Sequence, residues 1–253
     1  MLDCYYIDLE GDCSLEQSLI LYEKLSADRR NKVDKLKNQD MKKKQIIIGG
    51  FLQHVLGLYI PIPTNEFEFE YNEYGKPFVK GVDIHFNMSH SGRYAVVAVS
   101  DRNVGVDIER RRSNRINVAK RCFCKEEYEY IMAAESTDER EERFLEYWTL
   151  KEAYIKYVGA GLSIPLNSFR VVRESSISDV HRYEIIKGIH YKDDTEHDFF
   201  GSKRENVVLY SCPFGGIYRF SLCCEKKNNT DVIEMLSSCG NVKKIDFIDI
   251  LEG

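Results

Sequence analysis

The stretch from residue 148 to 162, WTLKEAYIKYVGAGL, restricts the local structure more than any other part of the chain. It combines one carboxylate, two lysines and a glycine stop in a single predicted helix. Gly159 and Gly161 follow the helical pattern as C-terminal caps, because glycine adopts left-handed backbone angles without steric cost. Ser136 and Glu139 have the spacing of an N-terminal capping box. The sequence therefore predicts one long helix between these two signals.

Glu152 is the first candidate for chemistry in this helix. One helical turn takes 3.6 residues, so Glu152 and Lys156 lie on the same face, which Trp148, the only tryptophan of the chain, shares. Such a face can hold a metal and a phosphate together. The same spacing is also typical of an ordinary surface ion pair worth about 0.2 to 0.5 kcal/mol, so the helix alone does not decide between the two.

The length and composition are those of a globular protein. With 253 residues the chain can bury a sizeable core, either as one large domain or as two smaller units. Hydrophobic residues make up 43% and charged residues 30% of the chain, which argues against a disordered or fibrous protein. The formal net charge of -5 gives no reason to expect a nucleic acid partner.

No segment indicates secretion or a membrane. The N-terminus, MLDCYYIDLEGDC, lacks the basic and apolar regions of a signal peptide. The most apolar stretch, residues 46–60, is interrupted by Gln53 and His54 and is too short to span a bilayer. The eight cysteines show neither a CxxC pair nor a zinc-site spacing, so we expect reduced thiols in the core. These features predict a cytoplasmic protein.

Alternating apolar residues predict the strands, and capping signals predict the helices. Ser14 and Gln17 indicate a helix to about residue 25, and residues 47–58 form an apolar helical pattern. The segment 84–100 is expected to form two strands joined through the polar residues 87–92. Other strands are expected at residues 4–9, 67–71, 104–108, 169–172, 183–186, 207–212 and 217–224. Residues 231–253 suggest a short amphipathic helix and a tail in which no chemistry is evident.

One predicted strand carries two carboxylates on the same side. Its period of two puts Val106 and Ile108 on one face and Asp107 and Glu109 on the other, about 7 Å apart along the strand. Two like charges at this separation repel unless a positive group lies beside them. A magnesium ion meets this need, because it typically binds one or two carboxylates together with substrate phosphates. A solvated pair at a strand end is the alternative.

Two basic segments interrupt the acidic chain. Residues 28–44 contain eight lysines and arginines, a number typical of a solvated helix face or, near a polyanion, of a phosphate-binding surface. Residues 110–121 contain six and no acidic residue, which suggests a surface for an acidic partner or, equally, a solvated loop.

Three blocks in a fixed order carry a family resemblance. They are GKP at residues 75–77, FNMSHSG at 86–92 followed by VGVDIE at 104–109, and the helix at 148–162. In this order and at these separations they resemble the signature blocks of the 4'-phosphopantetheinyl transferases of the large single-chain type. The resemblance runs from about residue 26 to about residue 224.

The resemblance implies an α+β fold of two similar halves in a pseudo-twofold arrangement, with the active site in the cleft between them. The first half is expected at residues 1–105 with the coenzyme A-binding residues, and the second at 106–225 with the metal and catalytic residues. Residues 226–253 would form a tail of unknown role.

The implied activity is transfer of the phosphopantetheine arm of coenzyme A to a serine of an apo acyl or peptidyl carrier protein. Adenosine 3',5'-bisphosphate is the implied product, Mg²⁺ the implied cofactor, with Mn²⁺ as a substitute, and a monomer without nucleic acid or membrane partners the expected state. Attack of the serine on the β-phosphate builds negative charge that a carboxylate-bound magnesium ion would neutralise.

Individual residues match functional positions of the family. The positions of the metal-binding carboxylates are matched by Asp107, Glu109 and Glu152. The coenzyme-binding positions are matched by Arg29, Lys32, Lys76, Pro77, Ser89, His90 and Lys156. Glu152, directly or through a metal-bound water, is the expected general base, and Lys156 is expected to stabilise or protonate the leaving phosphate.

Three positions depart from the family pattern. Arg29 replaces the more usual lysine, Tyr94 stands where tryptophan is frequent, and Ala153 stands where the family generally has serine. None of the three is an expected metal ligand, so they bear on substrate fit more than on activity.

Two alternative functions fit parts of the sequence. Ser89, His90 and Ser91 could supply a nucleophile and a base for acyl transfer, but neighbouring residues of a strand point to opposite faces, and no GxSxG elbow is present. The other is a non-catalytic module that binds coenzyme A or a carrier protein, against which the presence of all three carboxylates and Lys156 counts.

Overall fold

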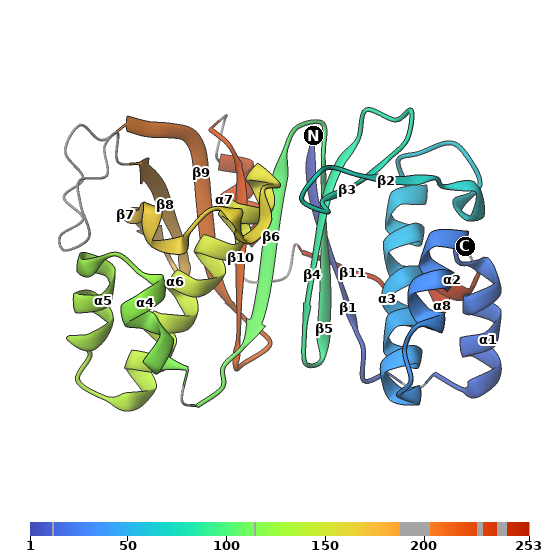
Figure 1. Cartoon of the computed structure of the whole chain (residues 1–253), viewed down its shortest axis with the longest axis horizontal. Coiled ribbons are helices and arrows are strands. Elements are labelled where there is room, and N and C mark those ends of the chain that lie inside the picture. Colours follow the sequence, from blue (N-terminus) through green and yellow to red (C-terminus); the bar gives the residue numbers. More distant parts are fainter. Residues whose placement is uncertain (12, 114, 188–202, 227–229, 237–241, 253) are drawn as a thin grey trace.

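Figure 1 shows the computed structural model, which describes residues 1–11, 13–113, 115–187, 203–226, 230–236 and 242–252. The helices are α1 (Leu15–Lys24), α2 (Ala27–Asp34), α3 (Gln39–Gly57), α4 (Ala119–Cys122), α5 (Lys125–Met132), α6 (Thr137–Val158), α7 (Thr230–Leu236) and α8 (Phe247–Glu252). The strands are β1 (Leu2–Asp8), β2 (Phe69–Tyr71), β3 (Pro77–Val79), β4 (His85–Ser91), β5 (Tyr94–Ser100), β6 (Val104–Arg110), β7 (Phe169–Ile177), β8 (Val180–Lys187), β9 (Lys203–Phe214), β10 (Tyr218–Glu225) and β11 (Lys243–Lys244). The fold class is α+β, as predicted.

The strands form two main sheets and one small hairpin. The first sheet has the strand order β11-β1-β5-β4, and the second has the order β6-β10-β9-β8-β7. The hairpin β2-β3 forms a separate two-stranded sheet, and Phe69 of β2 contacts Phe86 of β4. All pairs among the described strands are antiparallel except β1 with β11, and short turns join β4 to β5, β7 to β8 and β9 to β10.

The two sheets pack against each other in the middle of the molecule, and each carries helices on its outer side (Figure 1). The period of two in β5 divides its apolar residues between two cores. Val97 packs with Leu52 of α3 in the first core, whereas Val96 packs with Val106 of β6 in the core between the sheets. A third core, which includes the fully buried Leu150, joins α6 to the second sheet.

The helix ends follow local sequence signals. The Ser14 hydroxyl accepts from the Gln17 amide at 3.1 Å, and the Gln17 side chain accepts from the Ser14 amide at 2.8 Å, which confirms the capping box. Ser136 accepts from the Glu139 amide at 3.1 Å at the start of α6. Gly159 ends α6 with a φ of 77°, a left-handed conformation that favours glycine. The long helix is therefore confirmed between its two signals.

The polar residues 87–92 do not form the predicted connection. Residues 87–91 belong to strand β4, and the turn to β5 consists only of Gly92 and Arg93. The prediction was wrong because Asn87, Ser89 and Ser91 face the second sheet, where their side chains find hydrogen-bond partners instead of water.

The segment after β10 returns to the first sheet. β11 pairs in parallel with β1, and α8 packs against α1 and α3. Ile250 of α8 is only 3% exposed and belongs to the same core as Leu21 of α1. Val232 and Val242 belong to the core between the sheets, so the segment contributes to both cores.

The seven cysteines of the described residues are free, and all except Cys122 are buried, in agreement with the expected core thiols. The eighth, Cys239, lies outside the described residues. In the described part of the chain, no helix has both the length and the apolar character needed to cross a membrane.

Candidate active site

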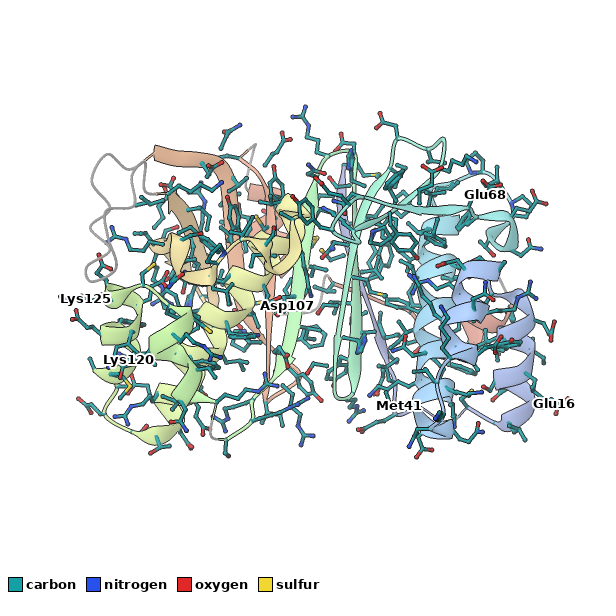
Figure 2. All side chains as sticks on the ribbon, viewed as in Figure 1. Glu16, Met41, Glu68, Asp107, Lys120 and Lys125 are labelled. Atoms are coloured by element: carbon teal, nitrogen blue, oxygen red, sulfur yellow. The ribbon has the colours of Figure 1, made fainter. Side chains whose placement is uncertain are left out.

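The family-like blocks meet where β4, β6 and α6 come together. β6 packs against both β4 and α6, and Gly105 makes the close approach to the helix possible. A Cβ atom at Gly105 would lie 2.8 Å from the Tyr157 Cα and would overlap the Ala153 carbonyl oxygen, so a larger residue does not fit. This approach brings Asp107, two residues further along β6, beside α6. Figure 2 labels Asp107 near the middle of the molecule.

Asp107 is buried, with 4% of its surface exposed. Its Oδ1 accepts hydrogen bonds of 2.7 Å from both the Lys156 ammonium and the Ser89 hydroxyl, and Lys156 also donates to Ser89 at 2.9 Å. The other oxygen, Oδ2, is buried and has no hydrogen-bond partner among the described residues. Because an unpaired buried carboxylate oxygen is unfavourable, Oδ2 is suited to bind a positively charged ligand.

Glu109 lies two residues further along the strand and is half-buried. Its Oε2 accepts a 2.7 Å hydrogen bond from Ser91, and its Oε1 lies 3.5 Å from the Arg115 guanidinium. Ser89 and Ser91 are alternate residues of β4, so Asp107 and Glu109 project from β6 in the same direction. This is the geometry that the period of the strand predicted.

Glu152 lies on α6, one helical turn before Lys156. Burial raises the pKa of the Glu152 carboxyl above its ordinary value, and the negative charges of Asp107 and Glu109 raise it further, while Lys156 opposes them. The three carboxylates thus influence one another electrostatically. A cation between them would relieve this repulsion.

His90 lies on the opposite face of β4 from Ser89 and is exposed. Partial desolvation lowers the pKa of His90, and the positive charges of Lys44 and Lys156 lower it further against the opposing effect of the two β6 carboxylates. The imidazole is therefore neutral at neutral pH. The Lys44 ammonium donates to the carbonyl of Gly92, two residues after His90.

Lys76 and Pro77 lie where the hairpin turn joins β3. The Lys76 ammonium donates to the carbonyl oxygens of Val104 at 3.2 Å and Tyr157 at 3.0 Å, and so joins the start of β6 to the end of α6. Burial lowers the pKa of Lys76 to about 8. Protein carbonyls engage this side chain, and contact of the segment with coenzyme A stays a prediction.

Arg29 and Lys32 lie on α2 and pack against β2. The Arg29 guanidinium lies 5.4 Å from the centre of the Phe69 ring, and the Lys32 ammonium lies 4.2 Å from the centre of the Tyr71 ring. In the described structure neither side chain forms an ion pair with a carboxylate of β6 or α6; Lys32 pairs with Asp28 at 3.1 Å. The fold does not bring these two residues into the group around Asp107, and their role in coenzyme binding also stays a prediction.

The carboxylates are compatible with a divalent cation by their chemistry, although the geometry is not that of a ready metal site. Among the described residues, no group of three His, Cys, Asp or Glu side chains is arranged to hold a metal ion. Two observations nevertheless fit Mg²⁺ or Mn²⁺, which both prefer carboxylate oxygens: the unpaired Oδ2 of Asp107 and the raised pKa of Glu152.

One residue that shapes this site, Lys151, had no predicted role. Lys151 is fully buried beside Glu152, and its ammonium lies 2.9 Å from Glu127 and donates to the carbonyl oxygens of Leu166 at 2.8 Å and Phe169 at 2.6 Å. These three contacts fix the rotation of α6 about its axis, and with it the direction of Glu152, which lies about 100° further around the helix. A lysine directly before the carboxylate was the available signal.

These features define an α+β protein whose buried carboxylates and neighbouring lysine suit the binding of phosphate groups and a divalent cation. Comparison with known families narrows this class. A family model described as the 4'-phosphopantetheinyl transferase superfamily matches residues 103–209, and one described as 4'-phosphopantetheinyl transferase, N-terminal, matches residues 12–102. The chain belongs to the 4'-phosphopantetheinyl transferase superfamily.

Individual relatives agree with this assignment. The 4'-phosphopantetheinyl transferase Sfp of Bacillus subtilis is 32% identical over 66% of this chain and 75% of its own length. The 4'-phosphopantetheinyl transferase gsp of Aneurinibacillus migulanus is 38% identical over 71% of this chain, and the match spans 65% of gsp. The match to the transferase HetI of a Nostoc strain, at 35% identity, spans about half of that relative, 51%.

Proposed function

We propose that this chain transfers the 4'-phosphopantetheine group of coenzyme A to a serine of an apo acyl or peptidyl carrier protein and releases adenosine 3',5'-bisphosphate. The observation that carries the proposal is the state of Asp107: one buried oxygen is held by Lys156 and Ser89, and the other has no partner in the described structure. This arrangement prepares one carboxylate oxygen for a cation while it keeps an ammonium beside it for phosphate. Family membership supports the same activity.

In the proposed reaction the carrier serine Oγ forms a bond to the β-phosphorus of coenzyme A. The bond from that phosphorus to the bridging oxygen breaks, and the electron pair leaves with adenosine 3',5'-bisphosphate. Glu152 accepts the serine proton, directly or through water, and its raised pKa suits a group that must hold a proton transiently. Lys156 is placed to neutralise charge on the leaving phosphate.

Asp107, Glu109 and Glu152 would hold the divalent cation, Mg²⁺ or in its place Mn²⁺. When bound, such an ion orients the pyrophosphate and neutralises the charge that develops on its oxygens. Ser89 holds one oxygen of Asp107, and Ser91 holds one oxygen of Glu109. Oδ2 of Asp107 is left for another ligand, whereas Oε1 of Glu109 lies 3.5 Å from Arg115.

We further propose that the coenzyme lies between the carboxylates and the β2-β3 hairpin, with Ser89, His90, Lys76 and Pro77 beside it. The basic residues Arg29 and Lys32 border the same hairpin from α2 and would hold the 3'-phosphate. The hairpin reaches the end of α6, where Asn72 donates to the Gly159 carbonyl at 2.7 Å.

The remaining expectations are proposals of the same kind. They are a pseudo-twofold relation of the two halves with a cleft between them, the division at residues 105 and 225, a monomeric state and a cytoplasmic location. Support for the first comes from the similar build of the two sides, each with a long helix, α3 or α6, packed on an antiparallel sheet.

Acyl transfer by Ser89 is disfavoured by the geometry. The Ser89 hydroxyl donates to Asp107, and His90 projects from the other face of the strand. A serine nucleophile needs its base within hydrogen-bond reach, and the neighbouring histidine does not meet this condition. Chelator treatment separates the two functions, because a serine hydrolase would retain its activity without magnesium.

The basic segment 110–121 is proposed as the docking surface for an acidic helix of the carrier. Arg111 and Arg115 pair with acidic residues of this chain, whereas Lys120 and Arg121 of the same segment are exposed. Reversal of charge at Lys120 and Arg121 to glutamate should raise the carrier KM at least about fivefold at low salt and less at high salt.

The matched control for this charge reversal is glutamate at Lys35 and Lys37, two exposed lysines of the other basic segment. The control should leave the carrier KM within about twofold of the wild-type value. An unchanged carrier KM at low salt in the Lys120 and Arg121 variant would count against docking at this segment.

A further inference from the structure

β6 is the edge strand of the second sheet in the described structure, with β10 on one side and β4 packed against the other. β4 and β6 are not paired strands, and β4 hydrogen-bonds within its own sheet only to β5. An edge strand presents backbone N–H and C=O groups that need partners when they are buried. The hydrogen-bond partners of the β6 backbone groups therefore show what holds this edge of the strand in place.

Side chains of the N-terminal part of the chain supply them. The Val106 amide donates to the Asn87 side-chain oxygen at 2.8 Å, and the Arg110 amide donates to the Ser91 hydroxyl at 3.1 Å. The Val104 carbonyl accepts from Lys76. Residues 104, 106 and 110 have the same parity, so their backbone groups lie on the same edge of β6.

We propose that Asn87 and Ser91 are positioning residues that set the register of β6 against β4 and thereby aim Asp107 and Glu109. The side chains of alternate β4 residues take the place of a neighbouring strand at the junction of the two sheets. The same face of β4 also carries Ser89, so the junction has three consecutive contacts. Asn87 accepts from the backbone of β6, and Ser89 and Ser91 donate to one carboxylate each, Asp107 and Glu109. The inference rests on the proposed function only for its effect on catalysis.

The hydrogen bonds of the two side chains favour this role over direct substrate contact. The Asn87 side-chain oxygen and the Ser91 hydroxyl are both already bonded to backbone groups of β6. The Ser91 hydroxyl is used twice, since it accepts from the Arg110 amide and donates to Glu109. A register shift of β6 by one residue would turn both carboxylates away from α6, because side chains alternate between faces.

Two kinds of measurement test the proposal on Asn87→Ala, Ser91→Ala and Ser91→Thr, which retains the hydroxyl. Amide hydrogen exchange by NMR reports the junction without any substrate, and steady-state kinetics with coenzyme A, magnesium and a carrier reports catalysis. Ser100→Ala is the matched control, because Ser100 is a buried serine of β5 whose hydroxyl donates to the Met1 carbonyl at 2.9 Å and accepts from the Arg102 amide at 3.2 Å, both outside β6.

We expect Asn87→Ala to speed exchange of the Val106 amide at least about fivefold relative to the other β6 amides, and Ser91→Ala to do the same for Arg110. Both should lower kcat about 10- to 100-fold while the KM for coenzyme A stays within about twofold, since small misplacements of catalytic groups mainly affect the chemical step. Ser91→Thr and Ser100→Ala should retain wild-type kcat.

Two results would overturn the proposal. One is wild-type kcat in folded Asn87→Ala and Ser91→Ala proteins; the other is exchange that rises equally in all β6 amides, which would indicate general loosening. If the wild-type chain itself transfers nothing to any carrier, the proposed function fails, while the exchange measurement still decides whether the side chains hold the junction.

Discussion

At the scale of single residues, the surroundings of Glu152 oppose the charged form that its proposed role requires. The fold buries its carboxyl near two other carboxylates, and both effects raise its pKa. Such a group disfavours its own charged form in the protein without ligands, yet the proposed reaction needs a carboxylate there. Strained electrostatics of this kind are found at functional sites more often than elsewhere.

Glu152→Gln should therefore separate function from stability. The amide keeps the shape of the side chain but can neither accept the serine proton nor bind a cation as an anion. Carrier modification should fall at least about 100-fold. Glu129→Gln on α5, where the glutamate is exposed, serves as the control and should keep full activity. Retained activity in Glu152→Gln would remove this residue from the mechanism.

The same variant makes a prediction about pH and the free energy of unfolding in metal-free buffer. A carboxyl with a raised pKa binds its proton more tightly in the folded state than in the unfolded state. Its contribution is complete below the ordinary carboxyl pKa and is lost as the pH rises through the raised pKa of the folded state. In chemical denaturation, the free energies of unfolding of wild type and Glu152→Gln should differ least in acid. Toward neutral pH the variant should become more stable relative to wild type. A constant difference would contradict the raised pKa.

At the scale of elements, the site depends on how closely α6 approaches β6. Gly105→Ala should destabilise the fold by at least about 3 kcal/mol, because the added Cβ meets backbone atoms of α6 that cannot move separately. Urea denaturation measures the loss. Gly11→Ala is the control, since its nearest neighbour for a Cβ is the Asp8 carbonyl oxygen at 3.6 Å. Equal stability of the two variants would show that the helix can retreat at little cost.

Local signals predicted the elements well where the chain itself supplies the hydrogen bonds. The caps at Ser14, Ser136 and Gly159 involve near neighbours in sequence, and all three stand in the structure. The strand residues 87–91 could not be recognised in this way, because their polar side chains form hydrogen bonds with β6, which belongs to the other sheet. Polarity alone made a buried strand look like a connection.

The candidate site was predictable in part for the same reason. The period of β6 placed Asp107 and Glu109 on one side, and the structure shows both projecting toward the serines of β4. The position of the Lys76 ammonium was not predictable, because its partners, the carbonyl oxygens of Val104 and Tyr157, are distant in sequence. Only the tertiary fold brings them together.

At the scale of the whole molecule, the segment after β10 ties the two sides together. It contributes to the core between the sheets and then packs α8 on the helices of the first sheet. The sequence predicted a short helix there but no role. Nothing in a local pattern indicates that a segment returns to the first strand of the chain.

Two isoleucines of α8 test whether this helix is packed against the first sheet's helices. Ile250 is 3% exposed and Ile248 is 53% exposed. Ile250→Ala should lower the free energy of unfolding by about 2 to 4 kcal/mol, because it leaves a cavity between α8, α1 and α3. Ile248→Ala should change it by less than about 0.5 kcal/mol. Similar effects of the two substitutions on urea denaturation would mean that α8 is not docked.

The most direct measurement is the intact mass of a carrier protein. A panel of apo acyl and peptidyl carriers is incubated with coenzyme A, magnesium and this chain, in parallel with Glu152→Gln, and each carrier is weighed by mass spectrometry. We predict that at least one carrier gains the mass of a single phosphopantetheine group on its serine, that chelation of magnesium prevents the gain, and that Glu152→Gln leaves the carrier unmodified. Unchanged masses across the whole panel with the wild-type chain would contradict the proposed function.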